Sequence, residues 1–315
     1  MTDTALTDPA ITGTALTDAA ITGTGTGTTA PALAVGEPLY VPNIEGPWAP
    51  VRQALRWHGH AVVHGHWQRW LPAALADPDL RNLLGGRDWE RFSGLTDPTA
   101  RSRFAASRLL VRHAVGAALS VDPGSVELSY KPGGRPYIRG CGQIELSLSH
   151  TRDLIVVALS GRGRIGVDTE LSDRRVRYAA VERSLCSPAE RARLAHLDEA
   201  ARNRELLRIW TLKEAYTKAL GQGMRLGFHQ FGFGSDGELC GPDGRPASHG
   251  EWGFGTHWLP DGYLISVARQ DAGLGDSGGV DGADTGVATM LDEGFMGEIV
   301  ELLGPANRPA PGGAT

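Results

Sequence analysis

The stretch RIWTLKEAYTKALGQG, residues 208–223, carries three chemically different side chains at steps of four. Its pattern is typical of a helix that ends at glycines. Four helical residues rotate the side-chain direction by only about 40°, so Trp210, Glu214 and Lys218 form one stripe. A solvated Glu-to-Lys pair, worth roughly a few tenths of a kcal/mol, is one interpretation. It leaves Trp210 unexplained, so we also consider a site where Glu214 is a metal ligand or base and Lys218 faces a phosphate.

Lysine is scarce in this chain. Basic residues are nearly all arginine, and the three lysines are Lys131, Lys213 and Lys218. Lysine is a compact point charge whose pKa is more easily tuned than that of arginine. The two lysines in this stretch therefore indicate positions where arginine would not serve, with codon bias as the alternative.

The segment RIGVDTE predicts a strand with two carboxylates on one face. Ile165 and Val167 would point to one side of the sheet. Gly166, Asp168 and Glu170 would then point to the other side. Adjacent carboxylates raise each other's pKa, a cost that a cation relieves. A small set of oxygen ligands suits Mg²⁺, whereas a solvated strand face remains the alternative.

The segment IELSLSHT also alternates between two faces. It predicts a strand with Glu145, Ser147 and Ser149 on one face and His150 at the end. A lone histidine is usually structural or solvated. Beside a serine at a strand terminus it could instead donate to a phosphate, and both interpretations stay open.

Periodicity predicts a body that mixes helices with short strands. Apolar residues recur at helical spacing over 67–84 and 98–118. The strands VELSY, IELSLSH, LIVVALS and RIGVDTE follow, and we expect an antiparallel meander. Ser187, Pro188 and Glu190 form a capping box that starts a helix. After the helix that carries Glu214, the segments FHQFGFG, WGFGTHW and YLISVARQ predict further strands.

The body has the pattern of an internal duplication. GRPYI at 134–138 precedes the strand LIVVALS, and GRPAS at 244–248 precedes YLISVARQ at the same spacing. A chance match of two turns is the alternative. A duplication predicts an α+β fold of two pseudo-symmetric halves, 37–162 and 163–270. Each half would be a small, mostly antiparallel sheet packed on a long helix, with a ligand in the cleft between them.

Composition limits the class of protein. The formal net charge of −5 lacks the basic excess of nucleic-acid or membrane-surface proteins. Three widely spaced cysteines without a CxxC pair argue against a disulfide framework or a zinc ribbon. The chain shows no signal-peptide pattern and no long apolar run. We therefore expect a cytoplasmic protein without nucleic-acid or membrane partners.

The ends of the sequence are of low complexity. TALTDPAITG recurs almost unchanged as TALTDAAITG, and we expect residues 1–36 to form a disordered leader. Residues 271–315 predict a flexible linker and tail with one possible short helix.

Four histidines lie close together in the segment WHGHAVVHGHW. His58 with His60, and His64 with His66, stand at alternate positions that could bind zinc or nickel on a strand face. Since no acid or cysteine at ligand spacing accompanies them, we expect adventitious metal binding or none.

Four motifs in order resemble those of one enzyme family. GVDTE at 166–170, followed by WTLKEAYTK at 210–218, resembles the paired signature of the 4′-phosphopantetheinyl transferases. GRPY at 134–137 and LSHT at 148–151 resemble two upstream motifs of that family. The resemblance covers roughly residues 85–270. The duplicated body is similar to the larger, monomeric class, in which two like halves enclose coenzyme A.

The resemblance implies a set of catalytic groups. Asp168, Glu170 and Glu214 match the Mg²⁺-binding acids of the family. Glu214, directly or through a bound water, would take the proton from a carrier serine. Lys218 matches the lysine that assists the leaving group, and Trp210 would pack behind Glu214.

The resemblance also implies contacts to coenzyme A. The matching positions are Ser149 and His150 for phosphates and Gly134, Arg135 and Pro136 along the adenine. Among Arg101, Arg103 and Arg112 of the upstream helix, we expect Arg103 to hold the 3′-phosphate.

The implied activity is transfer of 4′-phosphopantetheine from coenzyme A to a serine of an apo acyl or peptidyl carrier, releasing 3′,5′-adenosine bisphosphate. By analogy with the larger class, the carriers would serve polyketide or nonribosomal peptide synthesis, a secondary-metabolite and antibiotic pathway. Two alternatives stay open. One is a Mg²⁺-dependent nucleotide phosphohydrolase that uses the same acids. The other is a non-catalytic scaffold that binds coenzyme A or a carrier.

Overall fold

The computed structural model describes residues 33–131, 134–222 and 226–271. The predicted tail with its possible helix, and most of the predicted leader, lie outside these residues. Residues 33–36 are described and contact the body, because the Gly36 N–H donates to the ring of His60. The proposed boundaries of leader, halves and tail stay predictions.

The first half is a four-stranded sheet with helices. The sheet order is β1 (Leu39–Tyr40), β2 (His60–His66), β6 (Leu154–Ser160) and β5 (Glu145–Thr151). Its helices are α1 (Ala49–His58), α2 (Trp67–Ala76), α3 (Leu80–Gly94) and α4 (Pro98–Leu119), with a 3-10 turn η1 (Pro123–Ser125). A hairpin of β3 (Leu128–Tyr130) and β4 (Pro136–Ile138) follows.

The second half is a three-stranded sheet in the order β10 (Trp252–Trp258), β11 (Tyr263–Gln270) and β7 (Ile165–Leu171). Its helices are α5 (Tyr178–Leu185), α6 (Pro188–Ala195) and α7 (Glu199–Leu220). A 3-10 turn η3 (Phe228–Gln230) and a hairpin of β8 (Gly232–Phe233) and β9 (Leu239–Cys240) follow.

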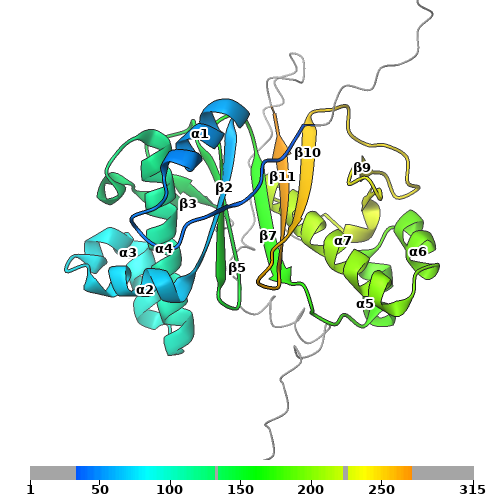
Figure 1. The fold of residues 1–315 in the computed structure, drawn as a ribbon, viewed down its shortest axis with the longest axis horizontal. Coiled ribbons are helices and arrows are strands. Elements are labelled where there is room, and N and C mark those ends of the chain that lie inside the picture. Colours follow the sequence, from blue (N-terminus) through cyan, green and yellow to red (C-terminus); the bar gives the residue numbers. More distant parts are fainter. Residues whose placement is uncertain (1–32, 132–133, 223–225, 272–315) are drawn as a thin grey trace, which may run out of the picture. The chain divides into compact units, whose positions relative to one another are not determined.

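The two halves repeat one connectivity, as Figure 1 shows. In each, a strand leads through helices to a 22-residue helix, α4 or α7. A small hairpin and two long antiparallel strands complete the unit, giving the strand orders β2-β6-β5 and β7-β11-β10. The predicted α+β fold of two similar halves, each a sheet packed on a long helix, is confirmed.

Helix boundaries follow local sequence signals. Helix α4 begins where Asp97 accepts hydrogen bonds from the N–H groups of Thr99 and Ala100, with Pro98 at the first helical position. The predicted capping box is present at α6, where the Ser187 hydroxyl and the Glu190 carboxylate each accept from the other's backbone N–H. Helix α7 ends at Gly221, which has the left-handed φ of 70°.

The predicted meander of four strands is wrong. Strands β5 and β6 pair with each other. Strand β7 instead leaves their sheet and pairs with the much later strand β11, with Asp168 opposite Ser266. The glycine- and arginine-rich turn before β7 carries the chain across. Because β7 and β11 are far apart in sequence, local periodicity contained no signal of this pairing.

Two smaller expectations also differ from the structure. The single helix predicted over 67–84 is two helices, because the Asp-Pro-Asp segment 77–79 interrupts it. The segment FHQFGFG, predicted as one strand, begins as a 3-10 turn and contributes only two residues to β8.

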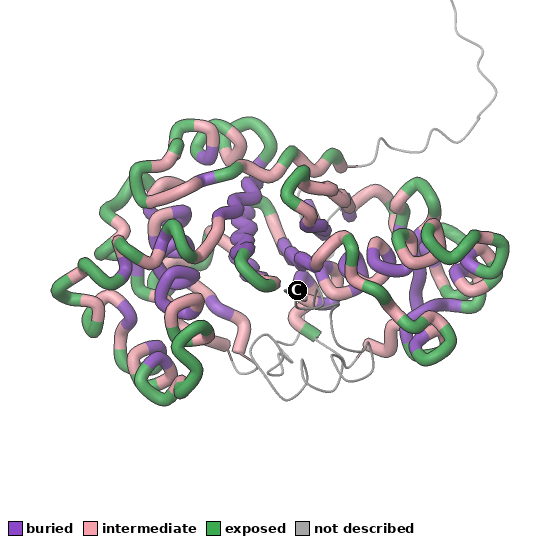
Figure 2. Tube along the Cα trace, turned by 60° about the horizontal axis from the view of Figure 1, so that its bottom comes forward, coloured by how far each residue is buried: buried purple, intermediate pink, exposed green. Residues whose placement is uncertain are grey.

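The two sheets share an apolar layer. Val62 and Val156 of the first sheet pack in one buried cluster with Val167 and Ile265 of the second. Figure 2 shows buried positions in the interior of the trace and exposed ones along its margins. Within the described residues, no helix combines the length and hydropathy that crossing a membrane requires.

The histidine segment does not form the continuous strand face that its spacing suggested. His58 is the last residue of α1, whereas His60 is buried at the start of β2. His60 accepts a hydrogen bond from the Gly36 N–H at 3.1 Å, and its other ring nitrogen contacts the His58 carbonyl and Arg269. Burial, with Arg269 adding to it, lowers the pKa of His60 to about 4. His60 is therefore a neutral structural residue at neutral pH.

The His60 environment predicts a pH dependence of stability. Its pKa is about 4 when folded and 6.5 in the unfolded reference, so the unfolded chain binds the extra proton between these values. Stability should therefore fall as the pH drops from 6.5 to about 4, by up to about 3 kcal/mol from this group. Urea unfolding across this range should show a shallower pH dependence for His60→Gln than for wild type. The exposed His249→Gln serves as the control, and equal slopes for all three proteins would contradict the prediction.

Candidate functional site

Strand β7 and helix α7 lie unusually close together at Gly166. A Cβ added at Gly166 would lie 1.9 Å from the Ala215 carbonyl oxygen and 2.5 Å from the Ala219 nitrogen. Only glycine permits this approach of two backbones. Since Gly166 and Asp168 are on the same face of β7, the contact brings Asp168 beside the last turns of α7.

Asp168 lies at the centre of a hydrogen-bonded network that joins the two halves. Lys218 Nζ is 2.6 Å from Asp168 Oδ1 and 3.2 Å from the Val167 carbonyl. From the first half, the Ser149 hydroxyl donates to Asp168 Oδ1 at 2.9 Å and accepts from Lys218 Nζ at 3.1 Å. On the same face of β5, the Ser147 hydroxyl accepts from the Val167 N–H. The predicted faces of β5 and β7 therefore meet at this network.

Glu214 is the least compensated acid of the site. Among the described residues, its buried Oε1 has no hydrogen-bond partner. Burial, with the negative charge of Asp168 in addition, raises the pKa of Glu214 to about 7, although Lys218 opposes the shift. The carboxyl is thus poised to gain or lose a proton near neutrality.

Glu170 forms an ion pair with a nearby arginine. Arg174 forms an ion pair with Glu170 Oε2, and the Leu171 N–H donates to Oε1 at 2.8 Å. Burial raises the pKa of Glu170, and Arg174 opposes that rise. The carboxylates of Glu170 and Asp168 therefore each have a separate cationic partner.

The predicted Mg²⁺ ligands fit a divalent cation only in part. Across the described ranges, no group of three histidine, cysteine, aspartate or glutamate side chains lies close enough to hold a metal ion. Asp168 and Glu214 do interact, and the unpaired Glu214 oxygen suits a cation. Glu170, bound to Arg174, does not complete the set in this arrangement. The three-acid site therefore stays a prediction.

His150 is surrounded by cations. Burial and the nearby charges of Arg103, Lys218 and Arg108 lower its pKa to about 3. The ring is therefore neutral, and the surrounding positive charge suits an anion such as a phosphate. Arg103 also lies 3.4 Å from the Arg152 carbonyl.

The other two candidate arginines on α4 lie elsewhere. Arg101 is placed over the ring of Phe92, at 4.5 Å from its centroid. Arg112 is buried and donates to the Val126 carbonyl. Of the three candidates, Arg103 is the one whose charge acts on His150, and its contact with the 3′-phosphate stays a prediction.

The Gly134, Arg135 and Pro136 segment is tied to the second half. Arg135 donates to the Ala219 carbonyl at 2.9 Å and the Ile165 carbonyl at 3.3 Å, and it pairs with Glu145 at 2.7 Å. Gly134 has a φ of 81°, which favours glycine in this turn. The segment therefore lies beside α7 and β7, and its contact with adenine stays a prediction.

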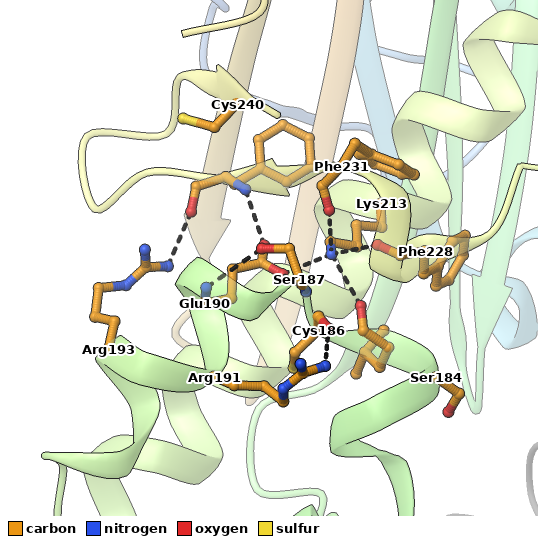
Figure 3. Close-up of polar contacts among 12 residues, drawn as sticks. Ser184, Cys186, Ser187, Glu190, Arg191, Arg193, Lys213, Phe228, Phe231 and Cys240 are labelled. Carbon is orange, nitrogen blue, oxygen red and sulfur yellow. Dashed lines mark hydrogen bonds and ion pairs between the residues drawn. The ribbon is translucent and has the colours of Figure 1, made fainter. Parts of the chain in front are cut away.

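Lys213, next to Glu214 in sequence, has a different role from Lys218. Its ammonium is fully buried and contacts Glu190 at 2.6 Å (Figure 3). It also donates to the carbonyls of Leu185, Phe228 and Phe231 at 2.7–2.9 Å. The same helix thus uses one lysine to hold α5, α6 and η3 in place and another in the site.

Trp210 packs against the same helix α5 and turn η3 that Lys213 contacts. It packs in the apolar cluster that includes Tyr178 and Val181, and its ring meets Phe228 edge-on at 6.5 Å. Its predicted influence on the rotamer of Glu214 is untested.

Sequence reasoning missed two cations at the site. The charge of Arg108 acts on His150, while its buried guanidinium pairs with Asp88 at 3.1 Å and lies over the ring of Phe104. Arg174 follows Glu170 in an irregular connection. Both depend on partners distant in sequence or in loops, so no periodic pattern identified them.

Comparisons with known proteins point to one family. Residues 164–267 match the family model of the 4'-phosphopantetheinyl transferase superfamily. The chain is 30% identical over 149 residues to the 4'-phosphopantetheinyl transferase HetI of Nostoc, covering 46% of this chain and 63% of that protein. It is 29% identical over 214 residues to a phosphopantetheinyl transferase of Thraustochytrium, covering 63% and 74%. A 4'-phosphopantetheinyl transferase of Bacillus subtilis is 25% identical over 123 residues, covering 39% and 54%.

The close contact at Gly166 predicts a severe effect of a single methyl group. Gly166→Ala should push β7 away from α7 and cost about 3 kcal/mol of unfolding free energy, because backbone atoms cannot move aside cheaply. Urea unfolding measures this cost. Gly161→Ala, whose added Cβ would meet only Ile144 at 3.9 Å, is the control. Similar stabilities of the two variants would show that the approach is not needed.

The Lys213 network predicts a pairwise effect. Lys213→Met should leave Glu190 buried without its cation and cost about 3–5 kcal/mol. The double variant with Glu190→Gln removes the unpaired charge, so it should be more stable than Lys213→Met alone. Chemical denaturation of wild type, Lys213→Met, Glu190→Gln and the double variant tests this, and purely additive losses would exclude a direct pair.

Proposed function

Since residues 164–267 match the family model of the 4′-phosphopantetheinyl transferase superfamily, we propose that the chain belongs to it and transfers 4′-phosphopantetheine from coenzyme A to a serine of an apo carrier protein. The other product is 3′,5′-adenosine bisphosphate. The observation that carries this proposal is the grouping of Asp168, Glu214 and Lys218 across the contact of β7 with α7. Both motifs that supply these residues lie within the matched region.

Glu214 has the properties of a general base. Its pKa of about 7 and its unpaired oxygen suit it to accept the proton of the carrier serine. The serine oxygen then attacks the β-phosphorus of coenzyme A, and the bond from that phosphorus to the bridging oxygen breaks. The electron pair leaves with 3′,5′-adenosine bisphosphate.

Lys218 has the properties of a leaving-group cation. It lies between Asp168 and Ser149, so its ammonium is held at the edge of the site. From there it would stabilise the negative charge that develops on the departing phosphate. Ser149 forms hydrogen bonds with both Lys218 and Asp168 and holds them in position. We also propose that Ser149 contacts a phosphate.

The remaining substrate contacts follow the charge distribution. The phosphates would face His150 and its neighbouring cations, with Arg103 on the 3′-phosphate. Gly134, Arg135 and Pro136 would lie along the adenine. A divalent cation such as Mg²⁺, bound by Asp168 and Glu214 and joined by Glu170 after rearrangement, would neutralise charge on the pyrophosphate.

The partners are part of the same proposal. The chain spans 63% of the Nostoc relative, so the activity of the whole relative is not carried over directly. We propose acyl or peptidyl carriers of polyketide or nonribosomal peptide synthesis as acceptors, and a cytoplasmic monomer as the working form. Nucleic acid and membrane play no part in the proposed reaction.

Intact-mass spectrometry tests the transfer directly. A panel of apo carrier domains is incubated with the protein, coenzyme A and Mg²⁺, with EDTA in a parallel reaction. We expect the mass gain of one phosphopantetheine on at least one carrier, abolished by EDTA. Glu214→Gln should slow the transfer about 10²–10⁴-fold, because it removes the base.

The control is Glu199→Gln, an exposed acid at the start of the same helix, which should transfer at the wild-type rate. Coenzyme A binding without any mass gain would favour a non-catalytic scaffold. Cleavage of coenzyme A without a carrier would favour a phosphohydrolase. A Glu214→Gln rate equal to wild type would remove the proposed base.

A further inference from the structure

Arg174 lies in the connection between β7 and α5 and is held there from two sides. Its side chain is only 10% exposed and pairs with Glu170, which is 8% exposed. Its backbone is fixed by helix α7, since the Asn203 amide donates to the Arg174 carbonyl at 2.8 Å and accepts from the Val176 N–H at 2.8 Å. The guanidinium is therefore a built part of the site.

The cations of the chain balance two of the three acids. Lys218 pairs with Asp168 and Arg174 pairs with Glu170, while Glu214 keeps an unpaired oxygen. While it is ionised, a carboxylate as buried as Glu170 is stabilised by a positive partner. A metal ion and Arg174 would supply the same positive charge to the same oxygens, so the two compete.

We propose that Arg174 is an internal counter-ion that holds Glu170 away from the metal-binding acids Asp168 and Glu214. The ion pair of Arg174 with Glu170 opens when a divalent cation binds, and Glu170 then joins the other two acids. This inference rests on the proposed function. It accounts for the incomplete set, in which Asp168 and Glu214 interact but no three acids converge among the described residues. Arg174 thereby sets the affinity of the site for metal.

The geometry of the pair favours exchange. Among the described residues, the buried Nε of Arg174 has no hydrogen-bond partner, so the guanidinium satisfies only part of its donors against Glu170. An incompletely satisfied buried pair gains less than a bidentate one. Breaking the ion pair of Arg174 with Glu170 therefore costs less free energy. That cost reduces the net binding free energy of the cation.

Metal titration of the full-length protein tests the inference without coenzyme A or carrier. The probe is Mn²⁺, whose free fraction is read by electron paramagnetic resonance after removal of bound metal with EDTA. We expect Arg174→Gln to bind Mn²⁺ about tenfold more tightly than wild type, equivalent to about 1.4 kcal/mol. Arg174→Lys, which keeps a charge but only one donor group, should lie between them.

Two controls separate a direct role from a general one. Arg175→Gln removes the same charge from an exposed neighbour and should change Mn²⁺ affinity far less. In a Glu170→Gln background, Arg174→Gln should have no further effect, because the oxygens for which it competes are gone. Circular dichroism of each variant checks that the fold is retained.

The outcomes are distinct. Unchanged or weaker Mn²⁺ binding by folded Arg174→Gln, or no Mn²⁺ binding by either protein, would overturn the inference. An equal gain in Arg175→Gln, or a gain that persists in the Glu170→Gln background, would do the same. If Arg174→Gln fails to fold, Arg174→Lys decides: affinity equal to wild type overturns the inference. Because these titrations contain no substrate, a failure of the transferase assay remains separate from them.

Discussion

The contact of Gly166 with the backbone of α7 is the constraint on which the site depends. This close approach brings Asp168 within 2.6 Å of Lys218 and lets the charge of Asp168 act on Glu214. The contact is held from behind by Lys213, which ties α7 to three surrounding segments, and by the apolar layer between the sheets. The glycine in GVDTE is thus as much a condition of the chemistry as the acids beside it.

The site also depends on charge balance across the two halves. Three carboxylates stand in a partly buried region with two cations close to them, and a serine from β5 joins Asp168 to Lys218. Arg135, from the hairpin of the first half, bonds both β7 and the end of α7. The halves are therefore linked by polar groups at the site and by apolar groups elsewhere. These polar contacts fix the position of one half relative to the other at the site.

Much of this could be predicted from sequence wherever the signal was periodic or local. Alternation placed Asp168 and Glu170 on one face and Ser147 with Ser149 on another, and helical spacing put Glu214 and Lys218 in one stripe. The capping box at Ser187 was also local. Pairings between distant residues carried no such signal. These include β7 with β11, Lys213 with Glu190, and Arg108 with His150. The ion pair of Arg174 with Glu170 spans only four residues, but it lies in a loop without a repeating pattern.

The repeated connectivity has a further consequence when β2 and β7 are compared. On the side that faces its long helix, β2 presents Ala61 and Val63, both in the apolar core of the first half. The equivalent side of β7 presents Gly166 and Asp168. In the first half this face contributes apolar packing, whereas in the second half it carries a charged side chain, which is costly to bury. The ion pair of Asp168 with Lys218 and its bond to Ser149 offset part of the cost of burying charge on β7, a cost that the apolar face of β2 does not incur.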